Sequence, residues 1–274
     1  MFDRNKAREV FLEYTSHYDP KDPMISSKTG HTMLVAGNAD RIAGSLGLTG
    51  IQTDFAYLLG LLHDIGRYEQ VKRFGTFVDR LSIDHAELGA DILFKEGLID
   101  SFQIDTFPGE YYRICEDSIR LHNKLSLPSG FSGEGRLFAD IIRDADKADI
   151  FRMVASIPFS ERAGKSRDSF KDSETFSDEV MECVRQQRCV PRDLVKSVFD
   201  GDVSHICLVF GLVFDESKRI VTEQGYLQML LDGTNAGNSR RLTEKGRQQM
   251  DEVRREVRKF LQDGPAGCIF SIVP

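Results

Sequence analysis

The sequence predicts an all-α protein, a multi-helix bundle with a helical C-terminal extension. Apolar residues recur at steps of three and four along most of the 274-residue chain, which is the period of an amphipathic helix. Glycine- and proline-rich stretches separate these segments, and few segments show the two-residue period of a strand. The length and the 41% of hydrophobic positions suffice for one large domain, or a domain plus an extension, with a sizeable core.

The helices of the first half are bounded by turn and cap signals. Residues 4–18 carry apolar side chains at helical steps, and the proline-rich segment 19–23 ends this helix because proline lacks an amide hydrogen. A second helix is expected to follow Ser26 or Ser27 and to end at the glycines of 47–50.

The third helix is expected over residues 55–66, with Thr53 or Asp54 as its cap. It is apolar on nearly every side and should therefore be deeply buried. Later helices are expected at about 85–93, 109–125, 135–156 and 241–262.

The second half of the chain is less regular. Residues 162–178 are polar and predict a surface loop, and residues 233–239 predict a flexible connector. Residues 206–214 are apolar throughout and fit either a buried helix or a strand. We expect one globular unit of three parts, which are an N-terminal helix packed on the core (1–24), the core (25–155) and a mainly helical extension (156–274).

Charge and composition disfavour several classes of protein. The chain has 36 basic and 43 acidic residues and a net charge of −7, which does not favour a dedicated nucleic-acid or membrane-surface binder. The basic residues gathered in 240–259 are interpreted as a solvated helix flank with ion pairs, because no basic–aromatic alternation accompanies them. The longest apolar runs, 55–62 and 206–214, are too short to cross a bilayer.

The expected location is the cytoplasm. The N-terminal residues show no signal peptide. The five cysteines form no Cys-x-x-Cys pair, which favours reduced thiols over a disulfide framework.

The histidines indicate where the chemistry lies. His63 is followed directly by Asp64 in an apolar helix, where a buried carboxylate without a partner strongly disfavours folding. A divalent cation that binds both side chains removes this cost. Neighbours on a helix point about 100° apart, so the remaining ligands must come from other helices. Those available are His31, His85, His122 and an aspartate of the segment 144–146. His17 and His205 lie outside the pattern and are expected to be structural or surface groups.

These residues and their neighbours resemble the HD-domain superfamily of metal-dependent phosphohydrolases. The pattern of that family is a His, a His-Asp doublet, in many members two further histidines, and a closing Asp, each on a separate helix of an all-α core. The matching strings are Gly30-His31, Leu62-His63-Asp64-Ile65-Gly66-Arg67, Asp84-His85-Ala86-Glu87-Leu88-Gly89, Leu121-His122-Asn123-Lys124 and Ala145-Asp146-Lys147. The resemblance covers about residues 25–155.

The resemblance implies a site for one or two divalent transition metals. One metal would be held by His31, His63, Asp64 and Asp146, and a second by Asp64, His85 and His122. Imidazole-rich ligands suit Fe, Mn, Co, Ni or Zn better than Mg. Asp64 would bridge the metals and take part in catalysis, and Arg67 and Lys147 would contact a phosphate.

Other interpretations of these side chains stay open. In members with one metal, the third and fourth histidines of the pattern would bind substrate. Asp144, Asp146 and Asp149 are all acidic, and the Ala-Asp step of the family selects Asp146 as the closing ligand. Asp149 lies three residues later and, instead of being the ligand, would orient a ligand histidine. Arg67 at a helix end would only neutralise the helix dipole. Lys147 would form an ordinary ion pair with Asp144 or Asp149.

The resemblance predicts an enzyme that hydrolyses a phosphomonoester or phosphodiester through a metal-activated hydroxide. Its partner would be a small phosphorylated substrate, such as a nucleotide, and the extension 156–274 would shape the pocket or a homo-oligomer interface. One alternative is a diiron oxygenase similar to myo-inositol oxygenase, which uses the same four His and two Asp. A second alternative is a non-catalytic regulator that binds a nucleotide.

Overall fold

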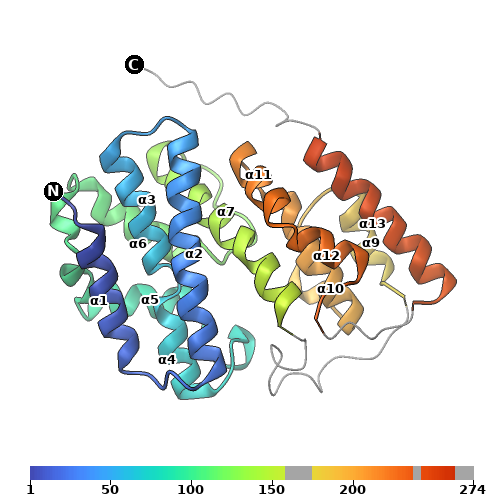
Figure 1. Ribbon diagram of the computed structural model, residues 1–274, viewed down its shortest axis with the longest axis horizontal. Coiled ribbons are helices and arrows are strands. Elements are labelled where there is room, and N and C mark those ends of the chain that lie inside the picture. The colour runs from blue at the N-terminus through green and yellow to red at the C-terminus, as the bar shows by residue number, and fades with distance from the viewer. Residues whose placement is uncertain (158–174, 237–241, 263–274) are drawn as a thin grey trace.

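The computed structural model describes residues 1–157, 175–236 and 242–262, and its regular elements in these ranges are all helices (Figure 1). No strand occurs among these described residues, so the all-α prediction is confirmed. Residues 162–174 of the expected loop and 237–239 of the expected connector lie outside the described residues, and residues 233–236 of the connector form no helix or strand.

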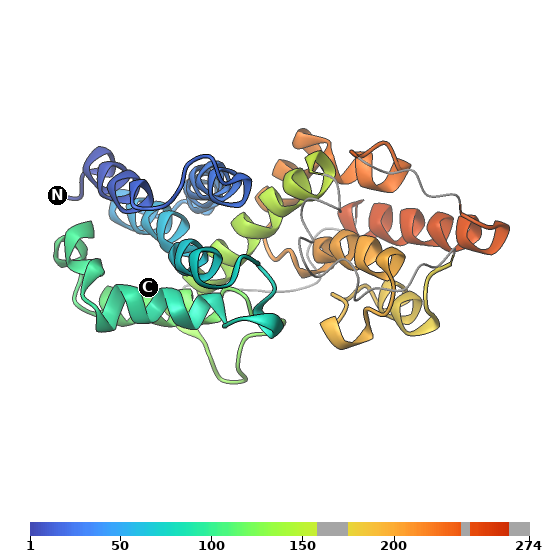
Figure 2. The same ribbon diagram turned by 90° about the horizontal axis from the view of Figure 1, so that it is seen from below.

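The helices form two groups that α7 joins, as Figure 2 shows from below. The first group holds α1 (Arg4–Ser16), α2 (Pro23–Ser45), α3 (Gly50–Leu62), α4 (Ile65–Phe74), α5 (His85–Ala90) and α6 (Glu110–Leu121). The second group holds α9 (Asp178–Arg185), α10 (Val198–Ile206), α11 (Asp215–Gln224), α12 (Tyr226–Asp232) and α13 (Glu244–Gln262). The joining helix α7 is Gly133–Ser156.

Helix α7 is buried along most of its 24 residues. It packs on α2, α3 and α6 at its N-terminal side and on α10, α11 and α12 of the second group. The division of the chain near residues 24 and 155 stays a prediction.

The second helix begins earlier than the sequence predicted. Helix α2 starts at Pro23, and the side chain of Asp22 accepts a hydrogen bond of 2.8 Å from the amide of Met24. Proline suits the first helical position because the amide there has no partner inside the helix. The proline-rich segment therefore ends one helix and begins the next.

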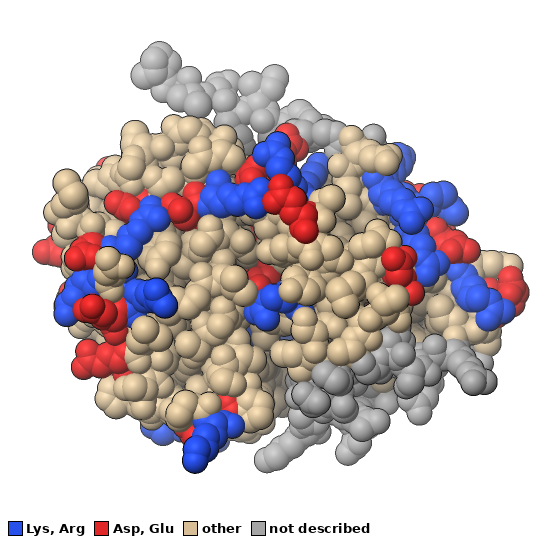
Figure 3. Space-filling view, in the orientation of Figure 1, with Lys and Arg blue, Asp and Glu red and all other residues tan. Residues whose placement is uncertain are grey.

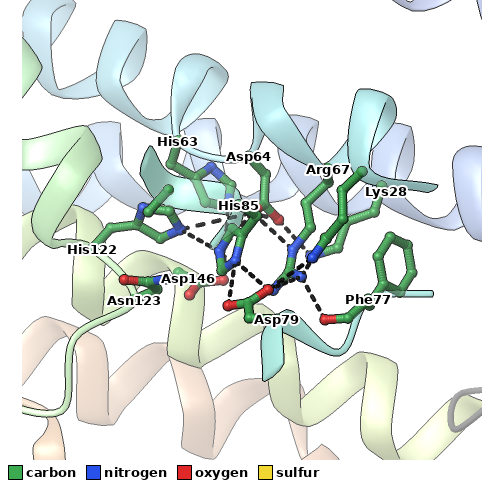
Figure 4. A network of polar contacts seen from close by, with 12 residues as sticks. Lys28, His63, Asp64, Arg67, Phe77, Asp79, His85, His122, Asn123 and Asp146 are labelled. Carbon is green, nitrogen blue, oxygen red and sulfur yellow. Dashed lines mark hydrogen bonds and ion pairs between the residues drawn. The ribbon is translucent and has the colours of Figure 1, made fainter. Parts of the chain in front are cut away.

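The single helix predicted over 55–66 is wrong, because the chain forms two helices there. Helix α3 begins at Gly50 behind a reciprocal cap of Thr49 and Gln52, and it ends at Leu62. Asp64 has φ −106° and ψ 17°, outside the helical range, and α4 follows it. This break directs the doublet's two side chains toward the same point (Figure 4).

The apolar segment 206–214 is neither one helix nor a strand. Helix α10 ends at Ile206, a 3₁₀ helix spans Cys207–Gly211, and the chain is extended at Leu212. The last helix begins at Glu244, and residue 241, where it was expected to start, lies outside the described residues.

Basic and acidic side chains are interspersed over the face drawn in Figure 3. On α13, Arg247 pairs with Glu244 and Arg254 with Asp251. These pairs agree with the interpretation of this segment as a solvated helix flank. Among the described helices, none combines the length and the hydropathy needed to cross a bilayer.

Candidate metal centre

Six side chains lie close together between the helices of the first group and α7, and Figure 4 labels all of them except His31. They are His31 of α2, His63 after α3, Asp64 between α3 and α4, His85 of α5, His122 after α6 and Asp146 of α7. All are buried except Asp146, whose side chain is 15% exposed. The structure thus brings together every residue that the resemblance implied as a ligand.

One half of the cluster joins two histidines and two carboxylates. The Nε2 atoms of His31 and His63 lie 3.3 Å apart. Asp64 Oδ2 lies 3.5 Å from the first of these nitrogens and 3.3 Å from the second. Asp146 Oδ1 lies 3.1 Å from His31 Nε2 and 3.7 Å from His63 Nε2. These atoms are close enough to surround a single cation.

The other half of the cluster joins His85 and His122. Their Nε2 atoms lie 3.1 Å apart. Asp64 Oδ1 lies 3.5 Å from His85 Nε2 and 3.7 Å from His122 Nε2. The two oxygens of Asp64 therefore face different halves of the cluster, as a bridging carboxylate would.

The remote ring nitrogen of every histidine faces a hydrogen-bond acceptor. His31 Nδ1 lies 2.7 Å from Asp149 Oδ2, His63 Nδ1 2.8 Å from Gly60 O, His85 Nδ1 2.8 Å from Asp79 Oδ2, and His122 Nδ1 2.7 Å from Ile119 O. Carbonyl and ionised carboxylate oxygens only accept, so each Nδ1 carries a proton. In a neutral ring, Nε2 then presents a lone pair to the centre of the cluster.

This arrangement fits a metal. Two pairs of imidazole Nε2 atoms face each other at 3.3 and 3.1 Å in a buried site, and a cation between the two nitrogens of a pair would be bound by both. Four imidazoles with two carboxylates suit Fe, Mn, Co, Ni and Zn. The acceptors behind the rings fix their orientation, as is usual around protein-bound metals.

A buried lysine adds positive charge to the cluster. Lys28 of α2 forms an ion pair with Asp64 Oδ2, and its ammonium lies 5.6 Å from the centre of the Phe77 ring. Burial raises the pKa of Asp64, but Lys28 and His63 outweigh burial and hold this pKa well below its ordinary value. Asp64 is therefore an ionised carboxylate at neutral pH.

Asp146 and His85 are also in the protonation states that metal ligands need. Burial acts to raise the pKa of Asp146, but the contact with His31 outweighs it and lowers this pKa. Burial, together with the charge of Arg67, lowers the pKa of His85 to about 3. Asp146 is thus ionised and His85 is neutral at neutral pH.

Arg67 of α4 lies beside the cluster and is mostly engaged. Its Nη1 donates to the carbonyl oxygen of Phe77 at 2.7 Å and to Asp79 Oδ1 at 3.0 Å. Its Nε lies 3.5 Å from Asp64 Oδ1. Because Asp79 also orients His85, Arg67 holds the segment that positions this histidine. A phosphate contact by Arg67 stays a prediction.

Asp144 and Lys147 of α7 lie next to the cluster but contact other groups. Asp144 accepts hydrogen bonds from the amides of Val213 and Phe214 at 2.8 and 3.0 Å, and so ties the second group of helices to α7. Lys147 Nζ lies 3.9 Å from Asp144 Oδ1 and donates to the carbonyl oxygen of Arg143 at 3.2 Å. Its contact with a phosphate also stays a prediction.

Asp149 is fully buried behind the cluster. It contacts the outer nitrogen of His31 at 2.7 Å and accepts from Arg152 Nε at 2.7 Å. It therefore orients a histidine of the cluster from behind, which is one of the two interpretations that the sequence left open.

A buried arginine holds the end of α6. Arg143 donates through Nη1 to the carbonyl oxygens of Leu121 and Lys124 and through Nη2 to that of Leu125 at 3.2 Å. These carbonyls flank His122, so the guanidinium fixes the turn that carries this histidine.

A cavity of about 760 Å³ opens onto the cluster, a volume in the range of small-molecule sites. Asp64, His85, His122 and Asp146 form part of its wall. His205 of α10, which was expected to be a structural or surface group, also lines the cavity, and its Nδ1 faces the carbonyl oxygen of Gly201 at 2.7 Å.

Three contributing residues were missed from the sequence. Lys28 lies three residues before His31, hence on the same face of α2, and this spacing is a signal that sequence reasoning could have used. Asp79 and Arg143 act across long loops or between helices, and no local periodicity marks them.

Comparison with known proteins agrees with this geometry. Residues 29–150 match the sequence profile of the family described as HD domain. Searches of curated proteins and of solved structures gave no match. The matched range contains all six residues of the cluster.

Proposed function

The chain carries an HD domain in residues 29–150, and from this premise we propose that it is a metal-dependent phosphohydrolase. Its substrate would be a phosphomonoester or phosphodiester of a nucleotide or of another small phosphorylated metabolite. The observation that carries the proposal is the convergence of four imidazole Nε2 atoms and two carboxylates beside a cavity.

The proposed ligands divide into two sets. His31, His63, Asp64 and Asp146 would hold one ion, and Asp64, His85 and His122 would hold the other. Divalent metals bound there would lower the pKa of a water molecule and neutralise the oxygens of a phosphoryl group.

Positively charged side chains beside the cluster would attract and position the substrate. Lys28, Arg67 and Lys147 all line the cavity beside the cluster, and their positive charge attracts a phosphate. Asp146 is more exposed than Asp64, 15% against 3% for the side chains. Since Asp64 is also paired with Lys28, Asp146 is the carboxylate better placed to accept a proton from the attacking water.

The test combines metal analysis with turnover. The purified protein is treated with chelator, reloaded with Mn, Fe, Co, Ni or Zn, and assayed on phosphomonoesters and phosphodiesters. We expect phosphate release that depends on metal, and we expect Asp64→Ala to abolish metal retention and turnover. Retention of both in that variant would contradict the proposal.

A matched pair of variants on α7 distinguishes the loss of a metal ligand from the general effect of replacing a buried carboxylate. Asp146→Asn should lose metal and activity. Asp140→Asn makes the same change at another buried carboxylate of α7, which pairs with Arg136, and should keep both. Iron-dependent oxygen uptake without phosphate release would instead identify an oxygenase with the same ligands.

A further inference from the structure

The cavity continues well beyond the cluster. From Asp146 it follows one face of α7, past Ile150 and Met153, to residues of the second group of helices. With a rise of about 1.5 Å per residue, Met153 lies roughly 10 Å along the helix axis from Asp146. The cavity is therefore deep enough for a phosphate at the cluster and an organic group beyond it.

The two ends of the cavity differ in chemistry. The end beside the cluster carries the cations Lys28, Arg67 and Lys147. The wall farther along is mostly aliphatic, with Ile150, Met153 and Val154 of α7 together with Val190, Pro191 and Leu208; Cys189, Arg192 and Asp193 also line the cavity. These side chains face a cavity instead of closing against each other, since Ile150, Met153 and Leu208 are only partly buried.

The aliphatic part offers little to recognise a nucleobase. Within the described lining, the phenyl ring is that of Phe77 and the amide is that of Asn123, and both lie beside the cluster (Figure 4). Phe77 packs against the charges of Lys28 and Arg67, and Asn123 donates to Asp84. Bases are read by stacking on rings and by hydrogen bonds to their edges.

Two polar residues of the cavity lining, Ser204 and His205, form hydrogen bonds within α10, whereas the charged residues Arg192 and Asp193 are exposed. Ser204 donates to the carbonyl oxygen of Gly201 at 2.8 Å, and His205 Nδ1 faces the same oxygen at 2.7 Å. Apolar side chains thus dominate the surface that an organic group would meet there.

We propose that the substrate's organic group is apolar, so that the protein acts on the phosphate ester of a hydrophobic alcohol, such as an alkyl phosphate. This inference rests on the proposed function and narrows its substrate class. The phosphate would lie at the cationic end, and the hydrocarbon would lie along Ile150, Met153 and Leu208.

Binding of alkylphosphonates tests the proposal without turnover, because their C–P bond is not an ester. Ethyl-, butyl-, hexyl- and octylphosphonate are titrated into the Mn²⁺-loaded protein by calorimetry. Each fully buried methylene should tighten binding about fourfold. We expect octylphosphonate to bind about a hundredfold or more tighter than ethylphosphonate, and a difference below about threefold would overturn the proposal.

Variants locate the effect within the cavity. Ile150→Ser should reduce the ratio of octyl- to ethylphosphonate affinity by about tenfold. Leu34→Ser makes the same kind of change at a leucine of α2 that is 45% exposed and outside the cavity lining, and it should keep the wild-type ratio. Equal ratios in both variants would contradict the assigned position of the hydrocarbon.

Hydrolysis assays distinguish a failure of this inference from a failure of the proposed function. Ethyl phosphate, octyl phosphate and adenosine 5′-monophosphate are compared by kcat/KM, and we expect octyl phosphate to be the best substrate. If esters are hydrolysed but chain length has no effect, or adenosine 5′-monophosphate is preferred, the inference fails and the proposed function stands. If octylphosphonate binds tightly and no ester is hydrolysed, the proposed function fails instead.

Discussion

The close contact between α4 and α5 leads to a prediction for the stability of a Gly66 variant, which follows from distances between backbone atoms. Gly66 of α4 lies against the backbone of α5, and a Cβ added there would lie 2.2 Å from the carbonyl oxygen of His85 and 2.5 Å from the amide nitrogen of Gly89. Ordinary contact begins at 3.4 Å. In Gly66→Ala the two helices must therefore separate by about 1 Å, because backbone atoms cannot rotate away as a flexible side chain can.

The expected cost has two parts. Overpacking of this kind destabilises by about 1–3 kcal/mol, and we expect the upper end of this range because both neighbours are backbone atoms. His85 is the first residue of α5 and would shift relative to His122 and Asp64. A displacement of about 1 Å at a reacting centre can reduce turnover roughly a hundredfold.

The assay is urea unfolding of the metal-free protein, followed by circular dichroism, together with metal analysis. The matched control is Gly37→Ala in α2, where the added Cβ meets nothing within 4 Å; it should stabilise by up to about 1 kcal/mol. The reasoning is refuted if Gly66→Ala unfolds with a free energy within about 0.5 kcal/mol of the wild-type protein and retains its full metal content.

Four further predictions concern the cluster and its supports. Asp149→Asn removes the charge behind His31 and should weaken metal binding about 10- to 100-fold; equilibrium dialysis measures this, and unchanged affinity would contradict the orienting role. Lys28→Met leaves the carboxylate of Asp64 without its ammonium partner, so the metal-free protein should lose about 3 kcal/mol or more of stability; added Mn²⁺ should restore most of it in thermal melts, and equal losses with and without metal would argue against ion binding at this carboxylate. Arg143→Gln shortens the group that holds the end of α6 and should lower the metal content by up to one equivalent in elemental analysis, whereas wild-type content would show that the turn holds its shape unaided. A chelator should lower the melting temperature of the wild-type protein, because a metal that binds only the folded state stabilises it; an unchanged melting temperature would speak against a resident metal.

Much of this architecture could be predicted from local patterns. The three- and four-residue period identified the helices, because contacts along a helix repeat at that spacing. Errors arose where capping and tertiary contacts override the period. Pro23 was taken as part of a helix stop, although proline also begins helices. The helical spacing of apolar residues also continues through Asp64, so this spacing could not reveal the turn between α3 and α4.

The residue types of the cluster and their order could be identified without coordinates, because each of them stands in a short string whose neighbours are local. The packing of the helices places the two oxygens of Asp64 toward different histidine pairs and brings Asp79 and Asp149 behind the rings. It also pairs Lys28 with the shared carboxylate and makes residues of the second group of helices part of the cavity wall. These features depend on distances between elements far apart in the chain, and such distances follow from how the helices pack and not from any local period.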